Sequence, residues 1–318
     1  MDTRHLVDPE ILPVIEALPF REFTRETLPQ ARAESAANFK LIGEPALTPA
    51  RMAARRADGS EIELFLYDPA PGAGGRAALY HIHGGGMILG SARDMGFGPS
   101  GMAAALGIPV ISVEYRLAPE TAFPGPQEDC LAGLAWLAEH AAEIGIDPGR
   151  IAVIGESAGG GLAAATALMA RDIGGPSIAA QVLVYPMLDH RTGGDACRWN
   201  NRATGEFVWT RAANRFGWEA LRGDYEPADE RKGWFSPALA GDLSGLPPTL
   251  LLTGSLDLFF DEDLDYARRL VDAGVPVELH SYPGAIHGFN VVQEAAVSQA
   301  FTRDLLGGIA RLLKLQPA

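Results

Sequence analysis

The strongest candidate for chemistry in this chain is a serine held between glycines. Gly155-Glu156-Ser157-Ala158-Gly159 follows a short run of apolar, β-branched residues and precedes an alanine-rich stretch. A nucleophilic serine in a G-x-S-x-G turn requires this strand–turn–helix setting, because the strained turn lifts the hydroxyl into the site. A glycine-rich turn that only caps a helix is the structural alternative. The context favours Ser157 as a nucleophile.

A second glycine run, His83-Gly84-Gly85-Gly86, lies well upstream at the end of another apolar stretch. Backbone N–H groups of such a run can converge on one point, because no side chain stands in the way. Together with the N–H of Ala158 they would form an oxyanion hole, in which one donor is worth roughly 3–4 kcal/mol. A phosphate-binding P-loop would need a lysine after the glycines, and none follows. An oxyanion hole is therefore the better interpretation.

A serine nucleophile needs a general base, which in this arrangement comes last along the chain. Only His190, His280 and His287 follow the serine. His190 falls at the start of an irregular stretch, and His280 lies inside a predicted strand. His287 stands in a loop after the last predicted strand, where a triad histidine belongs. We expect His287 to be the base, and activity to fall on acidification because only a neutral imidazole accepts a proton.

The orienting carboxylate should follow a strand between the serine and the histidine. Asp257 comes just past the end of a run of apolar residues. Asp261 and Glu262 are nearby rivals, but they resemble the first turn of the next helix, where acidic side chains interact favourably with the helix dipole. We predict Asp257 as the third member of the triad, with Asp261 and Glu262 as alternatives.

His81 and His83 lie two residues apart on one predicted strand and could suggest a pair of metal ligands. No cluster of further ligands accompanies them, so a core or supporting imidazole at His81 is the better interpretation. The two cysteines, Cys130 and Cys197, are far apart and lack the C-x-x-C spacing of a thiolate site. We predict neither a metal nor a cofactor.

Short apolar runs alternate with helical patterns over most of the chain, which indicates a mainly parallel sheet with helices on both faces. The predicted strands are 62–67, 77–83, 109–115, 151–155, 179–185, 249–253 and 276–282. The clearest predicted helices are 126–142, 158–171, 261–273 and 294–313. Active sites of open α/β sheets lie at the carboxyl ends of the strands, where all three triad candidates fall.

Two stretches break this alternation: residues 1–58, with many prolines before the first predicted strand, and residues 189–232, which are rich in Trp, Arg, Asn and Gly. We predict that they form a helical cap over a catalytic domain made of residues 59–188 and 233–318. Most aromatic residues of the insertion should form its small core, while one or two line the acyl pocket. Trp209 is our candidate for that role.

The composition excludes several other functions. The 318 residues are 47% hydrophobic and 21% charged, which is typical of a globular protein. A net charge of −14 without a basic run makes nucleic acid and anionic membranes poor partners. No apolar stretch is long enough to span a membrane, and the N-terminus lacks the apolar region of a signal peptide. With only two scattered cysteines, we expect a soluble, cytoplasmic protein.

In these motifs the chain resembles the hormone-sensitive-lipase-like esterases, bacterial family IV of the α/β hydrolases. The shared motifs run in family order: His83-Gly84-Gly85-Gly86, Tyr115-Arg116-Leu117-Ala118-Pro119-Glu120, Gly155-Glu156-Ser157-Ala158-Gly159-Gly160, Ser236-Pro237-Ala238-Leu239 and Ile286-His287-Gly288-Phe289. The resemblance implies an α/β-hydrolase fold with a cap, hydrolysis of short acyl esters without a cofactor, and homodimers in many members. It also implies oxyanion donors from Gly84, Gly85, Gly86 and Ala158.

The chain departs from the family pattern at several positions around the site. Leu258 and Phe259 replace the Pro-Leu that usually follows the acid. Met87 and His81 stand where aromatic residues are common, and Glu156 precedes the serine where Asp is more usual. The residues that we predict to contact substrate are Met87, Glu156, Trp209, Leu258, Phe259 and Ile286.

The sequence therefore predicts a serine carboxylesterase that acts on a small-molecule ester of short or medium acyl chain through an acyl-enzyme. The same machinery could cut an amide, a lactone or a specialised ester, or pass the acyl group to another alcohol. A non-catalytic ligand-binding role is a further alternative, because related plant hormone receptors resemble this family but have lost the triad histidine. Here that histidine is present as His287.

Overall fold

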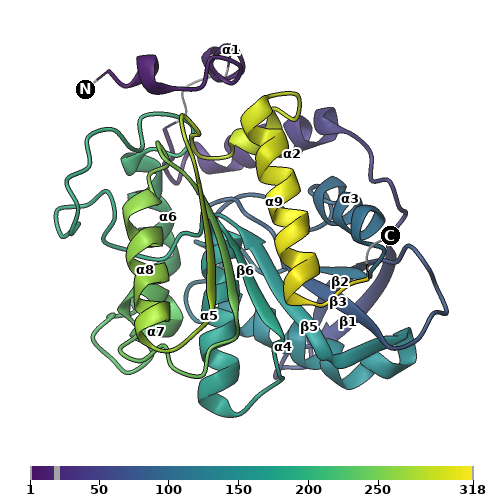
Figure 1. Cartoon of the computed structure of the whole chain (residues 1–318). Helices are drawn as coiled ribbons and strands as arrows, with labels where there is room; N and C mark the ends of the chain where they lie inside the picture. The colour runs from purple at the N-terminus through teal and green to yellow at the C-terminus, as the bar shows by residue number, and fades with distance from the viewer. Residues whose placement is uncertain (1, 18–21, 317–318) are drawn as a thin grey trace.

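An eight-stranded sheet runs through the computed structural model, which describes residues 2–17 and 22–316 (Figure 1). Its strands are β1 (Ala50–Arg55), β2 (Glu61–Tyr67), β3 (Arg76–Ile82), β4 (Val110–Val113), β5 (Ile146–Glu156), β6 (Ala180–Val184), β7 (Thr249–Gly254) and β8 (Val277–Tyr282). Their order is β1-β2-β4-β3-β5-β6-β7-β8. Strand β2 is antiparallel to its neighbours, and the pairs from β4 to β8 are parallel. The predicted mainly parallel sheet is confirmed.

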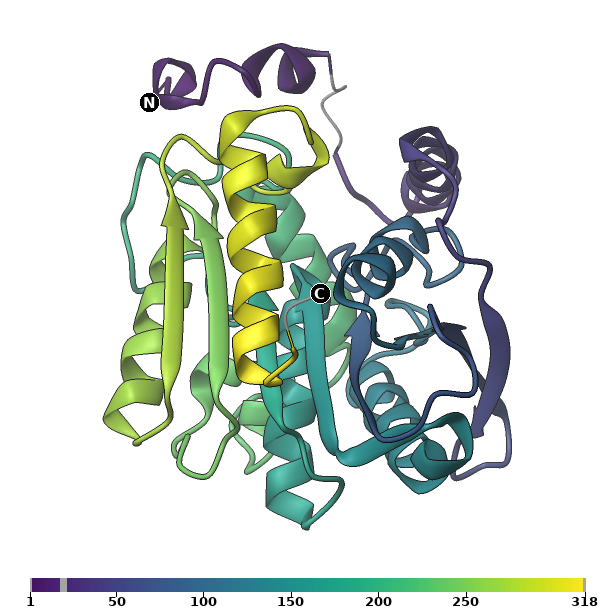
Figure 2. The ribbon, with the colours of Figure 1, turned by 45° about the vertical axis from the view of Figure 1, so that its right-hand side comes forward.

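Helices cover both faces of this sheet (Figure 2). They are α1 (Leu12–Glu16), α2 (Leu28–Ile42), α3 (Phe97–Leu106), α4 (Gly125–His140), α5 (Ala158–Ile173), α6 (Arg211–Arg222), α7 (Lys232–Phe235), α8 (Phe260–Asp272) and α9 (Ala296–Leu312), with short 3-10 turns at Arg4–Leu6, Ala141–Ile144, Pro237–Leu239 and Phe289–Val291. Side chains of α4, α5 and α8 fill one apolar cluster, and those of α3 and α9 fill the other. The four helices predicted from the sequence are all present, as α4, α5, α8 and α9.

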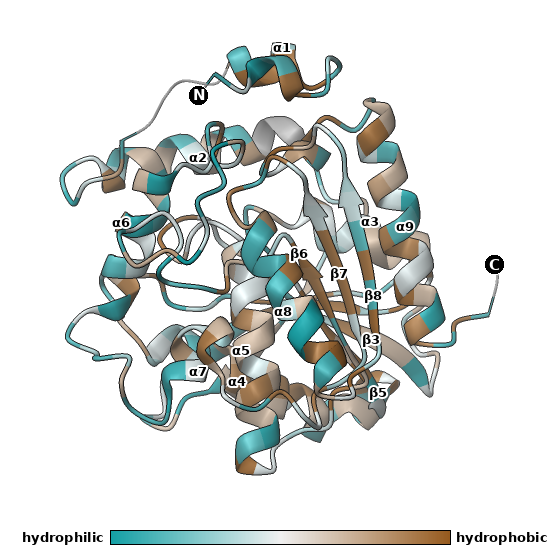
Figure 3. Ribbon diagram, turned by 60° about the vertical axis from the view of Figure 1, so that its left-hand side comes forward, coloured by the Kyte–Doolittle hydropathy of each residue, from teal (hydrophilic) through white to brown (hydrophobic). Residues whose placement is uncertain are grey.

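The two apolar clusters are filled from the sheet by successive residues of each central strand, which point to opposite faces. In β7, Leu250 and Leu252 belong to the cluster under α9, whereas Leu251 belongs to the cluster under α5. All three leucines are fully buried. A strand that is covered on both sides must be apolar throughout, which is why the central strands are continuous apolar runs in the sequence. Figure 3 shows β6 and β7 as hydrophobic strands behind helices with hydrophilic outer turns.

The first strand corrects the prediction that the sheet begins near residue 62. Strand β1 pairs with β2 at the sheet edge, although Arg51 and Arg55 are exposed. Only Ala54 of this strand is fully buried. Its alanines give too little alternation of apolar and polar residues to indicate a strand. Residues 1–58, which we predicted as the N-terminal part of a cap, therefore include one strand of the sheet.

Two segments meet beyond the carboxyl ends of the strands. Residues 2–17 lie above the tips of β7 and β8 in Figure 2. There the backbone N–H of Thr3 donates to Glu206 of the 189–232 insertion at 2.7 Å, and the N–H of Asp8 donates to the carbonyl of Gly284 at 3.0 Å. The insertion thus contacts the N-terminal segment, as the predicted cap requires. The cap itself stays a prediction.

Candidate active site

Ser157 occupies a sharp turn between β5 and α5. Its φ of 57° and ψ of −121° lie outside the regions that an L-residue normally adopts. The turn is held by its own backbone: the N–H of Ser157 donates to the carbonyl of Val184 at 2.9 Å, and its carbonyl accepts from Gly161 and Met187 at 3.0 Å. The sequence motif is therefore a strained nucleophile elbow, and not a simple helix cap.

The glycines around the elbow are required by close backbone contacts. A Cβ at Gly155 would lie 2.2 Å from the carbonyl oxygen of Gly159. A Cβ at Gly159 would lie 2.0 Å from the carbonyl oxygen of Ile82 in β3. Any side chain at either position would push the serine away from the sheet, so both glycines serve to position Ser157.

His287 and Asp257 complete a hydrogen-bonded chain with the serine. His287 Nε2 lies 2.9 Å from Ser157 Oγ, and its Nδ1 lies 2.8 Å from Asp257 Oδ2. The other carboxylate oxygen, Oδ1, accepts the N–H of Phe259 at 3.0 Å, which fixes the carboxylate. An ionised carboxylate only accepts, so Nδ1 carries the proton and Nε2 is free to accept the serine proton. The three predicted triad residues are in contact.

The alternatives for these roles lie elsewhere. His190 packs against Phe235, and His280 bonds Glu278 on β8. Glu262 is buried, where it accepts the N–H of Leu188 at 2.7 Å and holds the start of the insertion. Burial raises the pKa of the Glu262 carboxyl well above its usual range. The contacts therefore favour Asp257 and His287 over these rivals.

Aromatic rings surround the imidazole of His287. The rings of Phe259 and Tyr185 meet it edge-on, with centroids 5.3 Å and 4.9 Å away. The hydroxyl of Tyr185 donates to Asn290 Oδ1 at 2.8 Å. Tyr185 also has a positive φ of 35°. Sequence reasoning missed Tyr185, and the only signal for it was its place just after β6, at the carboxyl edge of the sheet.

The glycine loop after β3 presents free backbone donors beside the serine. Gly85 and Gly86 have φ values of 116° and 60°, which favour glycine. Within the described part of the chain, no hydrogen bond uses the N–H of Gly85, Gly86 or Ala158. Ala158 opens helix α5, whose N-terminus favours negative charge. These N–H groups are available to an anion.

His83 packs beneath the glycine loop in the core and is hydrogen-bonded to it. It is fully buried, its ring stacks on Tyr115 with centroids 4.2 Å apart, and its Nδ1 donates to the Gly84 carbonyl at 2.8 Å. Burial lowers the pKa of His83 to about 4, so the ring is neutral at physiological pH. A Cβ at Gly84 would lie 2.9 Å from the carbonyl oxygen of Glu156, so this glycine also lets the loop approach the elbow.

The predicted substrate contacts are mostly enclosed in this structure. Trp209 borders the glycine loop: a Cβ at Gly86 would lie 2.0 Å from its ring, and the ring centroid is 6.4 Å from that of His287. The carboxylate of Glu156 lies 3.0 Å from His81 Nε2. Other predicted contacts are almost fully buried, namely Met87, Leu258, Phe259 and Ile286. Their substrate roles stay predictions.

Neither a metal cluster nor a membrane helix is found in the described residues. No group of three His, Cys, Asp or Glu side chains among them is placed to hold a metal ion. None of their helices is long and apolar enough to cross a bilayer. Cys130 and Cys197 are both free.

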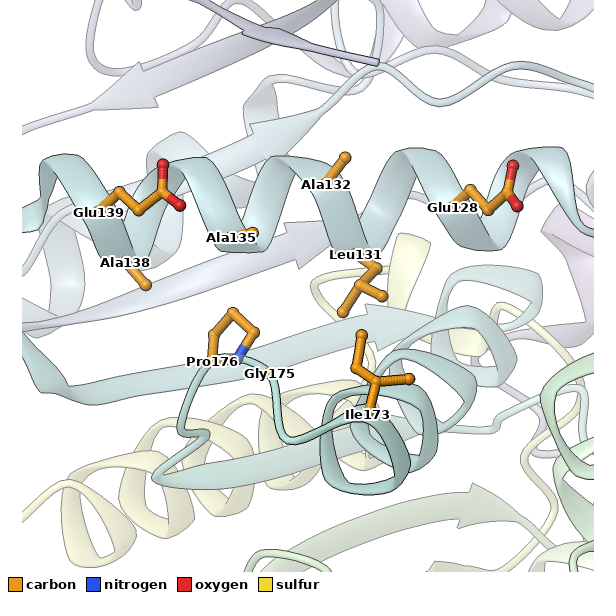
Figure 4. A pocket seen from close by; sticks show the side chains of 9 residues that line it. All are labelled: Glu128, Leu131, Ala132, Ala135, Ala138, Glu139, Ile173, Gly175 and Pro176. Carbon is orange, nitrogen blue, oxygen red and sulfur yellow. The ribbon is translucent and has the colours of Figure 1, made fainter. Parts of the chain in front are cut away.

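A groove of about 650 Å³ lies between α4 and the end of α5 (Figure 4). It is lined by apolar side chains such as Leu131 and Ile173, with Glu128 and Glu139 on α4. Its lining contains no serine, histidine or cysteine, so it has none of the groups needed for the chemistry described above. The candidate site is therefore the serine elbow.

Comparison with known proteins agrees with this geometry. A family model described as the alpha/beta hydrolase fold matches residues 79–291. Esterase LipI of Mycobacterium tuberculosis is 32% identical over 98% of this chain and 96% of its own, and ethyl acetate hydrolase of Pseudomonas putida is 36% identical over 75% and 76%. A solved bacterial heroin esterase covers 99% of this chain and 100% of its own, with 39% identity and a TM-score of 0.90. The chain therefore belongs to the α/β hydrolases, in their hormone-sensitive-lipase-like family.

Proposed function

We propose that this chain is a serine carboxylesterase that hydrolyses short- to medium-chain acyl esters through an acyl-enzyme intermediate. One observation carries the proposal. Ser157 on its strained elbow is hydrogen-bonded to His287 at 2.9 Å, which is hydrogen-bonded to Asp257 at 2.8 Å. This chain of contacts is what activates a serine hydroxyl for attack on a carbonyl.

Acylation uses each member of the chain in turn. Ser157 Oγ attacks the ester carbonyl while His287 Nε2 takes its proton. The carbonyl oxygen becomes an oxyanion, which the free N–H groups of Gly85, Gly86 and Ala158 stabilise, with Gly84 shaping the loop. Asp257 stabilises the imidazolium, which returns the proton to the leaving alcohol.

Deacylation repeats these steps with water as the nucleophile. His287 Nε2 accepts a proton from water, the hydroxide adds to the acyl carbonyl, and the tetrahedral intermediate expels Ser157 Oγ, which regains its proton from His287. The whole cycle consumes one ester and one water and requires no cofactor.

We infer that Trp209 limits the acyl chain. Its ring contacts Gly86 of the glycine loop, and its indole N–H donates to Asn214 Oδ1 at 3.1 Å, which fixes the ring. A large ring held beside the oxyanion donors leaves room for a short acyl group only. A relative from Pseudomonas putida is named ethyl acetate hydrolase, after an ester with a two-carbon acyl group, which supports the same preference.

We also propose that the N-terminal segment and residues 189–232 act as a cap. Gly217 of α6 supports this, because a Cβ there would lie 2.8 Å from the Gly86 carbonyl oxygen. Ser157 and His287 are only 6% and 8% exposed beneath these segments. A homodimer and a cytoplasmic location rest on the family resemblance and on composition, and they remain proposals.

The test is hydrolysis of p-nitrophenyl esters from acetate to palmitate by the wild type and by Ser157→Ala. We expect turnover that is highest with short chains and is lost in the variant. A p-nitrophenyl phosphonate should label Ser157 of the wild type with release of one p-nitrophenolate per chain.

Matched amide and lactone substrates, and an added acceptor alcohol, are assayed alongside. Turnover of one of these without ester hydrolysis would replace the carboxylesterase proposal by another acyl transfer with the same triad. An inert wild type, or equal rates in both proteins, would overturn the catalytic assignment of Ser157.

A further inference from the structure

A second histidine lies directly behind the nucleophile elbow, and the mechanism does not use it. His81 of β3 has its Nδ1 2.8 Å from Ser112 Oγ of β4 and its Nε2 3.0 Å from a carboxylate oxygen of Glu156. Glu156 is the last residue of β5 and precedes Ser157. The polar chain thus crosses three neighbouring strands and ends beside the nucleophile.

The strand register brings these side chains together. His81 is paired with Ser112 on one side and with Ile154 on the other. Glu156 lies two residues beyond Ile154 and therefore on the same face of the sheet. No loop has to close to form the contact, so the rigid sheet itself holds His81 against Glu156.

Burial makes this contact firm. Ser112 is fully buried and His81 is 2% exposed, whereas the Glu156 side chain is 23% exposed. The carboxylate accepts a hydrogen bond from the Nε2–H group, and Nδ1 then accepts one from the Ser112 hydroxyl. Water competes poorly for the buried imidazole, so its hydrogen bond restricts the rotamers of Glu156. Histidine here is an anchor for the residue before the nucleophile.

The length of the Glu156 side chain suits its contact with His81, in which the carboxylate oxygen lies 3.0 Å from Nε2. An aspartate would be one methylene shorter and would leave the imidazole without this acceptor, so each residue suits the other.

We propose that His81 is a positioning residue for the proposed esterase reaction: by holding the Glu156 carboxylate, it fixes the strained backbone of Ser157. The backbone bonds of the elbow reach Val184, Met187 and Gly161 on the β6 and α5 side. The bond to His81 is a tie on the β3 side. Displacing a reacting atom by about 1 Å can lower a rate on the order of 100-fold, so a loosened elbow should slow the attack itself.

The test compares His81→Phe, Glu156→Ala and the double variant, with kcat and KM measured on p-nitrophenyl acetate. Active-site titration with a p-nitrophenyl phosphonate gives the functional fraction. We expect each single variant to lower kcat and the phosphonylation rate about tenfold, with KM within about twofold. The double variant should lose no more than about a further twofold, because both changes break one interaction.

Two further variants separate positioning from mere stability. Glu156→Gln keeps an acceptor for His81 and should restore kcat to within about threefold of the wild type. His280→Phe is the control, because His280 also bonds a glutamate from a strand, at 2.7 Å, but on the edge strand β8. It should leave kcat unchanged.

Several outcomes would overturn the proposal. Independent losses in the double variant would mean that the residues act separately, and a change in KM alone would make Glu156 a substrate contact. If His81→Phe does not fold, a normal kcat in Glu156→Ala still refutes it. An inactive wild type would instead refute the proposed function, so the two failures are distinguishable.

Discussion

Two hydrogen-bond chains lie among the described residues, and each joins a serine, a histidine and a carboxylate. They share these residue types but differ in geometry and surroundings. One joins Ser157, His287 and Asp257, with contacts of 2.9 and 2.8 Å. The other joins Ser112, His81 and Glu156, with contacts of 2.8 and 3.0 Å. In the first, Nδ1 faces the carboxylate and Nε2 faces the serine; in the second the two nitrogens exchange places.

The surroundings of the two serines are the decisive difference. Ser157 has a φ of 57° at the start of a helix, next to the free N–H groups of the glycine loop. Ser112 lies within β4, which is paired on both sides, and is fully buried. Ser157 is 6% exposed and borders the glycine loop, whereas no rearrangement short of unfolding the sheet exposes Ser112.

Hydrogen-bonded residue types therefore do not by themselves make a catalytic triad. Strain that presents the hydroxyl, donors for the oxyanion and space for a substrate are needed as well. The hydrogen-bond chain of Ser112, His81 and Glu156 has the same residue types but serves to position Ser157.

The largest difference between the chains should follow from replacing the two serines. Ser157→Ala should lower kcat for p-nitrophenyl acetate on the order of 10⁴- to 10⁶-fold, since only oxyanion donors and binding remain. Ser112→Ala should leave kcat within about threefold and lower the free energy of unfolding by about 1–3 kcal/mol. A comparable loss of kcat in both variants would remove the distinction.

The carboxylates provide the next test. Asp257→Asn should lower kcat about 10⁴-fold, because the amide N–H₂ group favours the wrong tautomer of His287. Asp261→Asn is the matched control, since Asp261 lies four residues on, at the start of α8. It should retain kcat within about twofold. Equal losses would reopen the choice of acid.

A smaller effect, on the preference for acyl-chain length, is expected at Trp209, which lies beside the glycine loop. Trp209→Ala should raise the rate for p-nitrophenyl octanoate relative to acetate by about tenfold, because the ring no longer fills the space beside Gly86. Trp199→Ala, in the same insertion, removes a ring that packs on Arg198 and should leave the ratio unchanged. An unaltered profile in Trp209→Ala would place the acyl chain elsewhere.

The hydrogen-bond chain of Ser157, His287 and Asp257 could be predicted from the sequence, because each of its residues stands in a short, recognisable motif or directly after a strand. The turn around Ser157 needs glycines at fixed offsets, and the glycine run after His83 is equally explicit. His287 and Asp257 follow strand ends in the order that the fold requires. Each signal lies within a few residues of the group that it positions.

The hydrogen-bond chain of Ser112, His81 and Glu156 could not be predicted, because it depends on the pairing register between strands that are far apart in the sequence. Nothing local to His81 indicates that β4 and β5 will flank it, with Ser112 and Glu156 on the same face. The bond of Tyr185 to Asn290 is hidden for the same reason, since 105 residues separate them. Side-chain pairs between strands and loops need the fold before they can be recognised.

The last expected effect concerns the stability of the fold near the second hydrogen-bond chain, with no change in catalysis. Glu114 lies two residues beyond Ser112, just past β4, and accepts the N–H of Arg93 at 3.3 Å. Burial raises the pKa of Glu114 to about 7. The folded state therefore holds a proton that the unfolded state releases above about pH 4.5. Stability from this group is fully present below pH 4.5 and is lost as the pH rises through 7.

Replacing this carboxyl should flatten the pH dependence of stability. The loss between pH 4.5 and 7 is on the order of 2–3 kcal/mol, from 1.36 kcal/mol for each unit of pKa. Glu114→Gln keeps an acceptor for Arg93 but cannot ionise, so its free energy of unfolding in urea should fall less over this range. Glu61→Gln, at an exposed position of β2, should follow the wild type. Parallel curves for all three proteins would show that Glu114 ionises alike in both states.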